Sequence, residues 1–300
     1  MNHLFSAARR MLIPVLLTAL LVTGAKTPGG GFFLPEVLPA AAAAEPEDGT
    51  VLNILLIGRD DRKDAECARS DAMILCSFRK DSHKLTMTSF LRDLYVPIPG
   101  HGKNRLNAAY AFGGSKLLKK TLEQNFGVAI DGCVEVDFSC FPEIIDILGG
   151  VTIDLREDEA RFISRETGAR LSKGPQTLTG RQALVYTRIR KLDADGDFGR
   201  TRRQRKVLIA LMDSYRDAGL IKGLSMVRTL MPYVSTDMSR ETLLAHAKTM
   251  MPALSGMRLS GQTIPAPDTF VYRNIDGMEV ILADLKAAGR LLSDTVGSGK

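Results

Sequence analysis

The amino-acid sequence predicts an α/β protein, with one domain in which a central sheet is flanked by helices. Apolar runs of strand length alternate with amphipathic stretches of helix length along most of the chain. The chain has 300 residues, of which 45% are hydrophobic. This composition is enough for a sizeable core, and it excludes a disordered or collagen-like chain.

The first half of the domain is expected to begin with three strands. Residues 51–57, 72–78 and 85–90 are apolar runs, and a polar turn joins the second run to the third. Residues 115–126 carry an apolar stripe at helical spacing that ends at Gly127, which predicts a helix. The remaining elements of this half are a strand at 134–137, a helix at 138–148 and a strand at 151–155.

The second half is expected to be mainly helical. The sequence shows no internal repeat and no sharp domain boundary, so residues 49–300 are assigned to one domain. Its predicted elements are helices at about 200–218, 223–232 and 239–250, strands at 257–264 and 270–272, and a final helix at 278–292.

The N-terminal segment has the pattern of an export signal. Arg9 and Arg10 precede the uncharged, apolar run 11–25, and small residues suited to cleavage follow at 40–44. The sequence is therefore compatible with a released protein and with a membrane-anchored one. We expect residues 1–25 to be a signal peptide or membrane anchor and residues 26–48 a linker. The domain would then lie at the extracytoplasmic face of the cell membrane.

Positive charge is concentrated in one segment. The chain has a formal net charge of +6 and a pI near 9.2, and residues 181–206 alone hold nine basic and three acidic residues. A basic protein suggests a polyanionic partner such as nucleic acid or an anionic membrane. Confinement of the charge to one segment, the absence of Trp and the export signal argue against nucleic acid.

Charged residues also gather at the ends of the first three predicted strands, where α/β folds place their sites. Asp60 follows the first strand, and Asp71 precedes the second. The two carboxylates can converge on one divalent cation, although a solvated acidic loop explains their spacing equally well. Arg92 and Asp93 follow the third strand, and such a pair by itself is commonly only a turn.

The basic segment predicts a site for phosphate. If residues 186–190 are extended, Arg188 and Arg190 project to the same side. The apolar stripe of the following helix leads back to Gln204 and Arg200, and a buried arginine needs an anionic partner. A phosphate or diphosphate bound by guanidinium groups meets that need. We expect the other basic residues of the helix to be solvated or to snorkel with their charged ends in solvent, namely Arg202, Arg203, Arg205 and Lys206.

The four cysteines do not predict a metal site. Cys67, Cys76, Cys133 and Cys140 lack the C-x-x-C spacing of zinc sites. Two disulfides and buried free thiols are both compatible with the sequence. The scattered histidines give little support to a Ser-His-Asp or Cys-His enzyme.

Taken in order, seven segments resemble the LytR-CpsA-Psr family, and their combination is more specific than any one of them. They are Asn53 to Gly58 with Asp60 and Arg62, Arg69-Ser-Asp71, Ser89 to Pro99, Asn107 to Gly114, Gly149-Gly-Val151, Gln176 to Arg190, and Gly196 to Gln204. The departures from the family pattern are Arg59, Thr179 and Arg205.

The resemblance implies a mixed sheet surrounded by helices, with an apolar cavity for a polyprenyl chain. It implies a phosphotransferase that moves a glycopolymer from a polyprenyl diphosphate carrier onto peptidoglycan and joins the two through a phosphodiester. The implied cofactor is Mg²⁺, with Mn²⁺ as the alternative. It assigns the metal to Asp60 and Asp71, and the diphosphate to Arg69, Arg92, Arg188, Arg190 and Arg200 together with Gln204 and Asp197. Arg92, Arg188, Arg190 and Asp71 are the expected catalytic residues.

Two other functions are compatible with parts of the sequence. A hydrolase of the same lipid carriers would use the same residues with water as nucleophile. A nucleic-acid-binding regulator is suggested by the basic segment alone. The general base is either Asp71 or Asp197, and Asp71 cannot act freely as a base while it ligates a metal.

Overall fold

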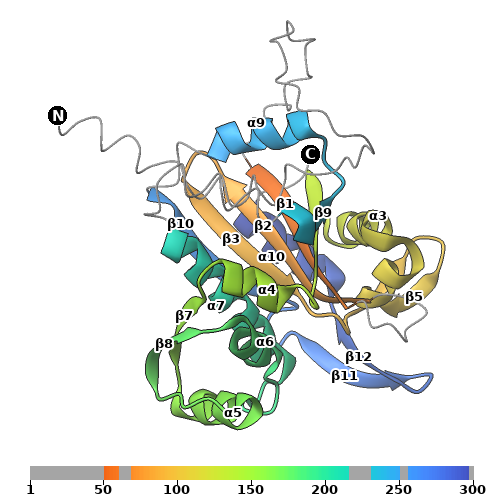
Figure 1. Ribbon diagram of the computed structural model, residues 1–300. Coiled ribbons are helices and arrows are strands. Elements are labelled where there is room, and N and C mark those ends of the chain that lie inside the picture. The colour runs from red at the N-terminus through yellow and green to blue at the C-terminus, as the bar shows by residue number, and fades with distance from the viewer. Residues whose placement is uncertain (1–50, 61–68, 216–230, 251–255, 297–300) are drawn as a thin grey trace, which may run out of the picture.

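A six-stranded mixed sheet forms the centre of the protein (Figure 1), in a computed structural model that describes residues 51–60, 69–215, 231–250 and 256–296. Its strand order is β10-β3-β2-β1-β6-β9. The antiparallel pairs join β1 (Val51–Asp60) to β2 (Arg69–Arg79), β2 to β3 (Lys84–Phe90), and β6 (Gly132–Asp137) to β9 (Val234–Thr236). The parallel pairs join β1 to β6, and β3 to β10 (Arg258–Ile264). The mixed sheet and its first three strands confirm the sequence prediction.

Helices cover both faces of this sheet. On one face, α3 (Leu106–Phe126) and α10 (Leu285–Val296) pack in one apolar cluster with Met73 and Leu75 of β2. On the other face, Ile74 and Cys76 of the same strand cluster with residues of α7 (Asp197–Tyr215) and α9 (Arg240–Met250). Successive side chains of a strand point to opposite faces, so a strand covered on both faces is apolar throughout.

A smaller unit extends from the sheet and has its own apolar cluster (Figure 1). Its two-stranded ribbon pairs β7 (Val151–Leu155) with β8 (Gly174–Leu178), so the predicted strand at 151–155 forms outside the central sheet. Three helices complete the unit: α4 (Phe141–Ile147), α5 (Glu157–Thr167) and α6 (Gly180–Arg188). A Cβ atom at Gly180 would lie 1.9 Å from the carbonyl oxygen of Pro142, so only glycine lets α6 approach α4 this closely.

Two hairpins stand at the edges of the molecule. One pairs β4 (Tyr95–Ile98) with β5 (Gly102–Arg105), and the other pairs β11 (Phe270–Ile275) with β12 (Met278–Ala283). A short 3₁₀ turn, Met231–Tyr233, precedes β9.

Several predicted elements need correction. The predicted final helix at 278–292 is strand β12 followed by α10, because Val280 and Ile281 are buried where β12 pairs with β11. The predicted helix at 115–126 begins earlier, at Leu106, and is interrupted by non-helical dihedral angles at Gly113 and Gly114.

Some predictions fall outside the described residues. These are the export segment and linker at 1–48, and most of the predicted helix at 223–232. Within the described ranges, no helix combines the length and the apolar character needed to cross a membrane.

Candidate functional site

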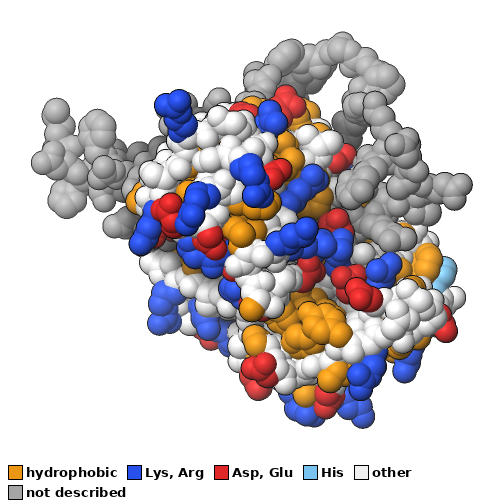
Figure 2. Space-filling view, turned by 90° about the horizontal axis from the view of Figure 1, so that it is seen from below, with side chains coloured by type: hydrophobic (Ala, Val, Ile, Leu, Met, Phe, Trp, Pro, Cys, Tyr) orange, Lys and Arg blue, Asp and Glu red, His pale blue; other side chains and the backbone are white. Residues whose placement is uncertain are grey.

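A polar pocket of about 340 Å³ lies at one end of the central strands, where β1, β3 and β6 end and β2 begins. The start of β2, the residues just after β3 and β6, the end of α6 and the first turns of α7 therefore deliver side chains to one place. We call it the arginine pocket, and its lining residues are Asp71, Arg92, Phe138, Thr187, Arg188, Arg190, Arg200 and Gln204. Seen from below, Lys and Arg side chains gather with Asp and Glu on this face, beside hydrophobic side chains (Figure 2).

Arg92 is held in the pocket by two carboxylates. Its Nη1 donates to Asp71 Oδ1 at 2.7 Å, and its Nε lies 3.4 Å from Asp93 Oδ2. Burial disfavours the charge on Arg92, but the hydrogen bond and negative charge of Asp71, with Asp93 and Asp197, raise its pKa above the ordinary value. Arg92 is therefore a fixed positive charge, and it lines the pocket together with the other predicted arginines Arg188, Arg190 and Arg200.

Asp197 connects two further arginines of the pocket. It accepts from Arg200 Nη2 at 2.8 Å, and its other oxygen lies 3.3 Å from Arg190 Nε. Asp197 is the first residue of α7 and is not among the residues that line the pocket. The carboxylate therefore orients both guanidinium groups toward the pocket.

Arg200 is buried on the core side of α7, as its place on the helical stripe predicts. Its side chain is only 6% exposed, and its Nε hydrogen has no acceptor among the described residues. Burial and the nearby Arg190 and Arg92 outweigh the attraction of Asp197 and lower the pKa of Arg200 to about 10, so the residue remains charged at neutral pH. A buried, incompletely paired guanidinium is what an anionic ligand would satisfy.

Arg188 and Arg190 both line the pocket, although the condition of an extended segment at 186–190 is not met. Residues through Arg188 belong to α6, and Ile189 ends the helix with extended dihedral angles (φ −61°, ψ 128°). Thr179 and Gln182 form a capping box that starts the helix, and Tyr186 is buried in the cluster of the smaller unit. The change from helix to extended chain brings the two arginines into the same pocket.

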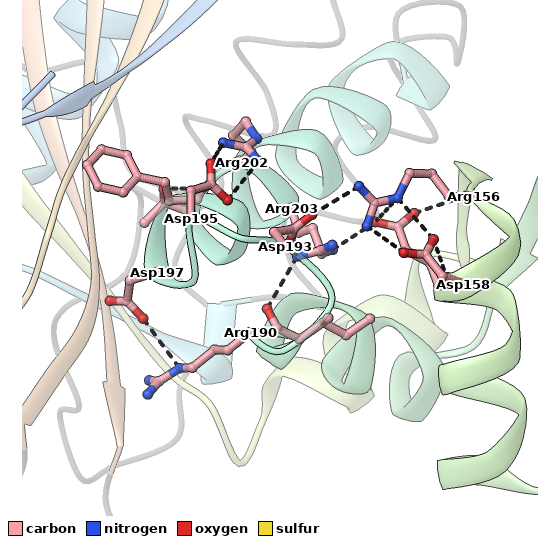
Figure 3. A network of polar contacts seen from close by, with 12 residues as sticks. Arg156, Asp158, Arg190, Asp193, Asp195, Asp197, Arg202 and Arg203 are labelled. Carbon is pink, nitrogen blue, oxygen red and sulfur yellow. Dashed lines mark hydrogen bonds and ion pairs between the residues drawn. The ribbon is translucent and has the colours of Figure 1, made fainter. Parts of the chain in front are cut away.

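Two arginines expected to be solvated are buried instead. Arg203 is 4% exposed, and its Nε donates to Glu159 Oε1 at 2.8 Å (Figure 3 shows the surrounding network). Arg203 Nη1 lies 2.5 Å from Asp193 Oδ2 and also donates to the backbone oxygen of Ile189 at 3.3 Å. Arg203 therefore holds the residue that separates the two pocket arginines Arg188 and Arg190.

Arg205 is 7% exposed, and its side chain extends from α7 to strands β3 and β10 of the sheet. Its Nη1 donates to the hydroxyls of Ser89, at 2.6 Å, and Thr263, at 3.1 Å. Burial lowers its pKa to about 10. Of the four residues expected to be solvated, only Arg202 and Lys206 are exposed.

The predicted metal ligands are only partly described. The backbones of Asp60 and Arg69 pair across β1 and β2, two residues from Asp71, but the side chains of Asp60 and Arg69 lie outside the described part of the structure. Asp71 lines the pocket and contributes a carboxylate there. Among described residues, no group of three His, Cys, Asp or Glu side chains forms a metal cluster.

An apolar cavity of about 180 Å³ adjoins the arginine pocket between the sheet, α4 and α7. Phe138, Thr187 and Gln204 line both spaces and form their boundary. The remaining lining is almost wholly hydrophobic: Leu56, Ile57, Gly58, Ala72, Ile74, Cys76, Leu85, Met87, Val136, Phe141, Ile144, Ile145, Leu148, Val207, Leu208, Leu211 and Met212. Cys76 is a free buried thiol here, and burial raises its pKa to about 12. Cys133 and Cys140 are also free thiols, while Cys67 lies outside the described residues.

Sequence reasoning missed Phe138 and Thr187. The Phe138 ring lies under the Arg188 guanidinium, 5.9 Å from ring centre to Cζ. Gly58 makes room for this ring, because a Cβ atom there would lie 2.7 Å from Phe138 Cζ. The only sequence signal was an aromatic residue directly after a strand that ends at the site.

The fold and the site together define a class: an α/β protein in which arginines suited to an anionic ligand adjoin an apolar cavity. The chain matches the model of the LytR_cpsA_psr family over residues 38–289. It therefore belongs to that family, which confirms the resemblance noted in the sequence.

Two curated relatives illustrate the match. The chain is 38% identical over 188 residues to "Regulatory protein MsrR" of Staphylococcus aureus strain Mu50, covering 59% of this chain and 55% of the relative. It is 38% identical over 199 residues to "Polyisoprenyl-teichoic acid--peptidoglycan teichoic acid transferase TagU" of Oceanobacillus iheyensis, covering 64% and 60%. The chain thus spans little more than half the length of these relatives.

Solved structures agree with the fold. A structure titled "TagT bound to LIIa-WTA" has a TM-score of 0.67 at 28% identity, covering 83% of this chain and 91% of that one. A structure of YwtF (TagT) with bound octaprenyl pyrophosphate lipid has a TM-score of 0.63 at 26% identity, with the same coverage.

Proposed function

We propose that this protein transfers a glycopolymer from a polyprenyl diphosphate carrier to peptidoglycan and releases polyprenyl phosphate. One observation carries the proposal: a pocket rich in arginine shares Phe138, Thr187 and Gln204 with an apolar cavity. A ligand with a diphosphate next to a hydrocarbon chain suits such a site. The names of TagU and of the lipid-bound TagT structure support this ligand and this reaction.

The arginines would bind the diphosphate and neutralise the charge that gathers around phosphorus during transfer. Phosphoryl transfer depends mainly on positioning and electrostatic stabilisation. Arg92, Arg188, Arg190 and Arg200 supply four positive charges around one pocket. Gln204 lies at the boundary with the cavity and would contact the ligand where the lipid begins.

In the reaction, a sugar hydroxyl of the acceptor attacks the phosphorus that carries the glycopolymer. The new phosphorus–oxygen bond replaces the bond to polyprenyl phosphate, which leaves, and the hydroxyl proton is lost. Of the two candidate bases, Asp71 lines the pocket, whereas Asp197 engages Arg190 and Arg200 with its two oxygens. We therefore assign Asp197 to positioning the arginines, and because Asp71 is assigned to the metal, the hydroxyl proton passes to water.

Asp71 and Asp60 are proposed to hold Mg²⁺, with Mn²⁺ as a substitute. A carboxylate oxygen is the ligand that these hard cations prefer, and Asp71 presents one beside the arginines. The pairing of Asp60 with Arg69 puts a second carboxyl-bearing residue at the same edge of the sheet. The cation would add positive charge on the phosphate oxygens.

The proposed reaction takes place outside the cytoplasm, at the outer face of the cell membrane. The N-terminal sequence pattern, Arg9 and Arg10 before an apolar run, supports export by a signal peptide or anchor. A nucleic-acid-binding role receives less support, because Arg200, Arg203 and Arg205 of the basic segment are buried and cannot face a polyanionic surface.

The test uses the Arg188→Lys/Arg190→Lys double variant in a purified transfer assay. Lysine keeps the charge but loses the planar fork that binds two oxygens at once, so we expect transfer to fall by about two orders of magnitude. Arg181→Lys, at an exposed residue at the other end of α6, is the matched control and should transfer normally. Full transfer activity in the double variant would contradict the assignment of this pair.

A further inference from the structure

We propose that Tyr272 and Phe270 of the β11–β12 hairpin form a platform that binds a sugar ring at the outer side of the arginine pocket. This inference rests on the proposed function, because it assigns a place to the sugar attached to the diphosphate.

Three aromatic rings lead from the core to the surface. Phe198, which is 4% exposed, stacks on Phe270 with the ring centres 5.1 Å apart. Phe270 meets Tyr272 edge to face at 5.3 Å, and Tyr272 is 60% exposed. A buried and a half-buried ring thus support the exposed ring of Tyr272 from one side.

The platform lies beside the arginine pocket. Tyr272 pairs with Ile281 across the hairpin, and the Ile281 amide donates to the backbone oxygen of Asp93 at 2.9 Å. Phe198 directly follows Asp197, the residue that orients Arg190 and Arg200. Partial burial and the negative charges of Asp197, Asp93 and Asp195 raise the pKa of Tyr272, which agrees with this proximity.

The platform and the apolar cavity are built from different elements. The cavity meets the pocket at Phe138, Thr187 and Gln204, and none of its lining residues comes from the hairpin. The hairpin instead adjoins the segment of Arg92 and Asp93. A ligand whose hydrocarbon enters the cavity would direct the group beyond its diphosphate toward Tyr272.

An exposed aromatic ring supported in this way suits a saccharide. The face of a sugar ring that carries C–H groups is weakly positive, and the face of an aromatic ring is negative, so the two stack. The charged pair Asp195–Arg202, exposed at the start of α7, offers hydrogen-bonding partners for hydroxyl groups in the same region.

The experiment measures binding of two probes by isothermal titration with the purified chain. The probes are farnesyl diphosphate and farnesyl diphosphate bearing N-acetylglucosamine on its terminal phosphate. Tyr272→Ala should weaken binding of the sugar-bearing probe by about 5- to 10-fold and leave farnesyl diphosphate unchanged. Tyr272→Phe keeps the ring and should retain affinity. Phe112→Ala removes another exposed aromatic residue, one stacked on His101 of the β4–β5 hairpin, and is the matched control.

The outcomes distinguish a failure of the sugar platform from a failure of the proposed function. Equal affinities of wild type and Tyr272→Ala for the sugar-bearing probe would overturn the platform and leave the proposed function intact. Equal losses for both probes would also overturn it, since they would show that Tyr272 acts on the diphosphate or on folding. A wild-type protein that binds neither probe would overturn the proposed function and the platform together.

Discussion

Replacing Arg203 with Met should destabilise the protein strongly, because it leaves two buried carboxylates without their main partner. Glu159 and Asp193 have side chains that are 5% and 7% exposed, and both contact the Arg203 guanidinium. Breaking a buried ion pair by removing one member typically costs about 3–5 kcal/mol. Arg156 still contacts Asp193 at 2.9 Å, so the loss should fall near the lower end, at about 3 kcal/mol.

Urea unfolding followed by circular dichroism measures this change. The control is Arg202→Met, the neighbouring residue, whose pair with Asp195 is about half exposed at both ends. An exposed pair contributes about 0–1 kcal/mol, so this variant should unfold close to wild type. Equal unfolding free energies for the two variants would refute the claim that Arg203 is the buried centre of this network.

Two further predictions concern single carboxylates. Burial acts to raise the pKa of Asp193, but hydrogen bonds and charges from Arg203 and Arg156 outweigh it and lower the pKa below the ordinary value. The stabilising effect of Asp193 is therefore full above its unfolded pKa of about 4 and is lost as pH falls through the lower, folded value. The unfolding free energy of wild type should exceed that of Asp193→Asn at neutral pH, with a gap that narrows below about pH 4; a constant gap would contradict the pairing. For Asp71, Mg²⁺ should raise the melting temperature of wild type but not of Asp71→Asn. An equal rise in both proteins would show that Asp71 does not bind the metal.

The central strands could be predicted from the sequence because burial on both faces leaves a continuous apolar run. The same signal failed at residues 278–283, where a short apolar run suits a strand and a helix equally. There the pairing with β11, a tertiary contact, decides the structure.

The burial of some arginines could likewise be predicted from the sequence, and that of others could not. Arg200 could be placed because the helical stripe of α7 passes through it, and its partner Asp197 is one turn away. Arg203 could not, because Glu159 lies 44 residues away on α5. Arg205 binds hydroxyls of β3 and β10, and neither contact leaves a local pattern in the sequence. Arg188 and Arg190 line the same pocket, but the extended backbone that the sequence argument required is not present, since α6 continues to Arg188.

The most direct test of the proposed function is the release of polyprenyl phosphate from a polyprenyl-diphosphate-linked glycopolymer, measured with and without peptidoglycan. Transfer predicts release that depends on peptidoglycan, with the glycopolymer recovered on the acceptor through a phosphodiester, and loss of both in the Arg188→Lys/Arg190→Lys variant. Release at the same rate without peptidoglycan would instead identify a hydrolase that uses water as nucleophile, and it would contradict the transferase assignment.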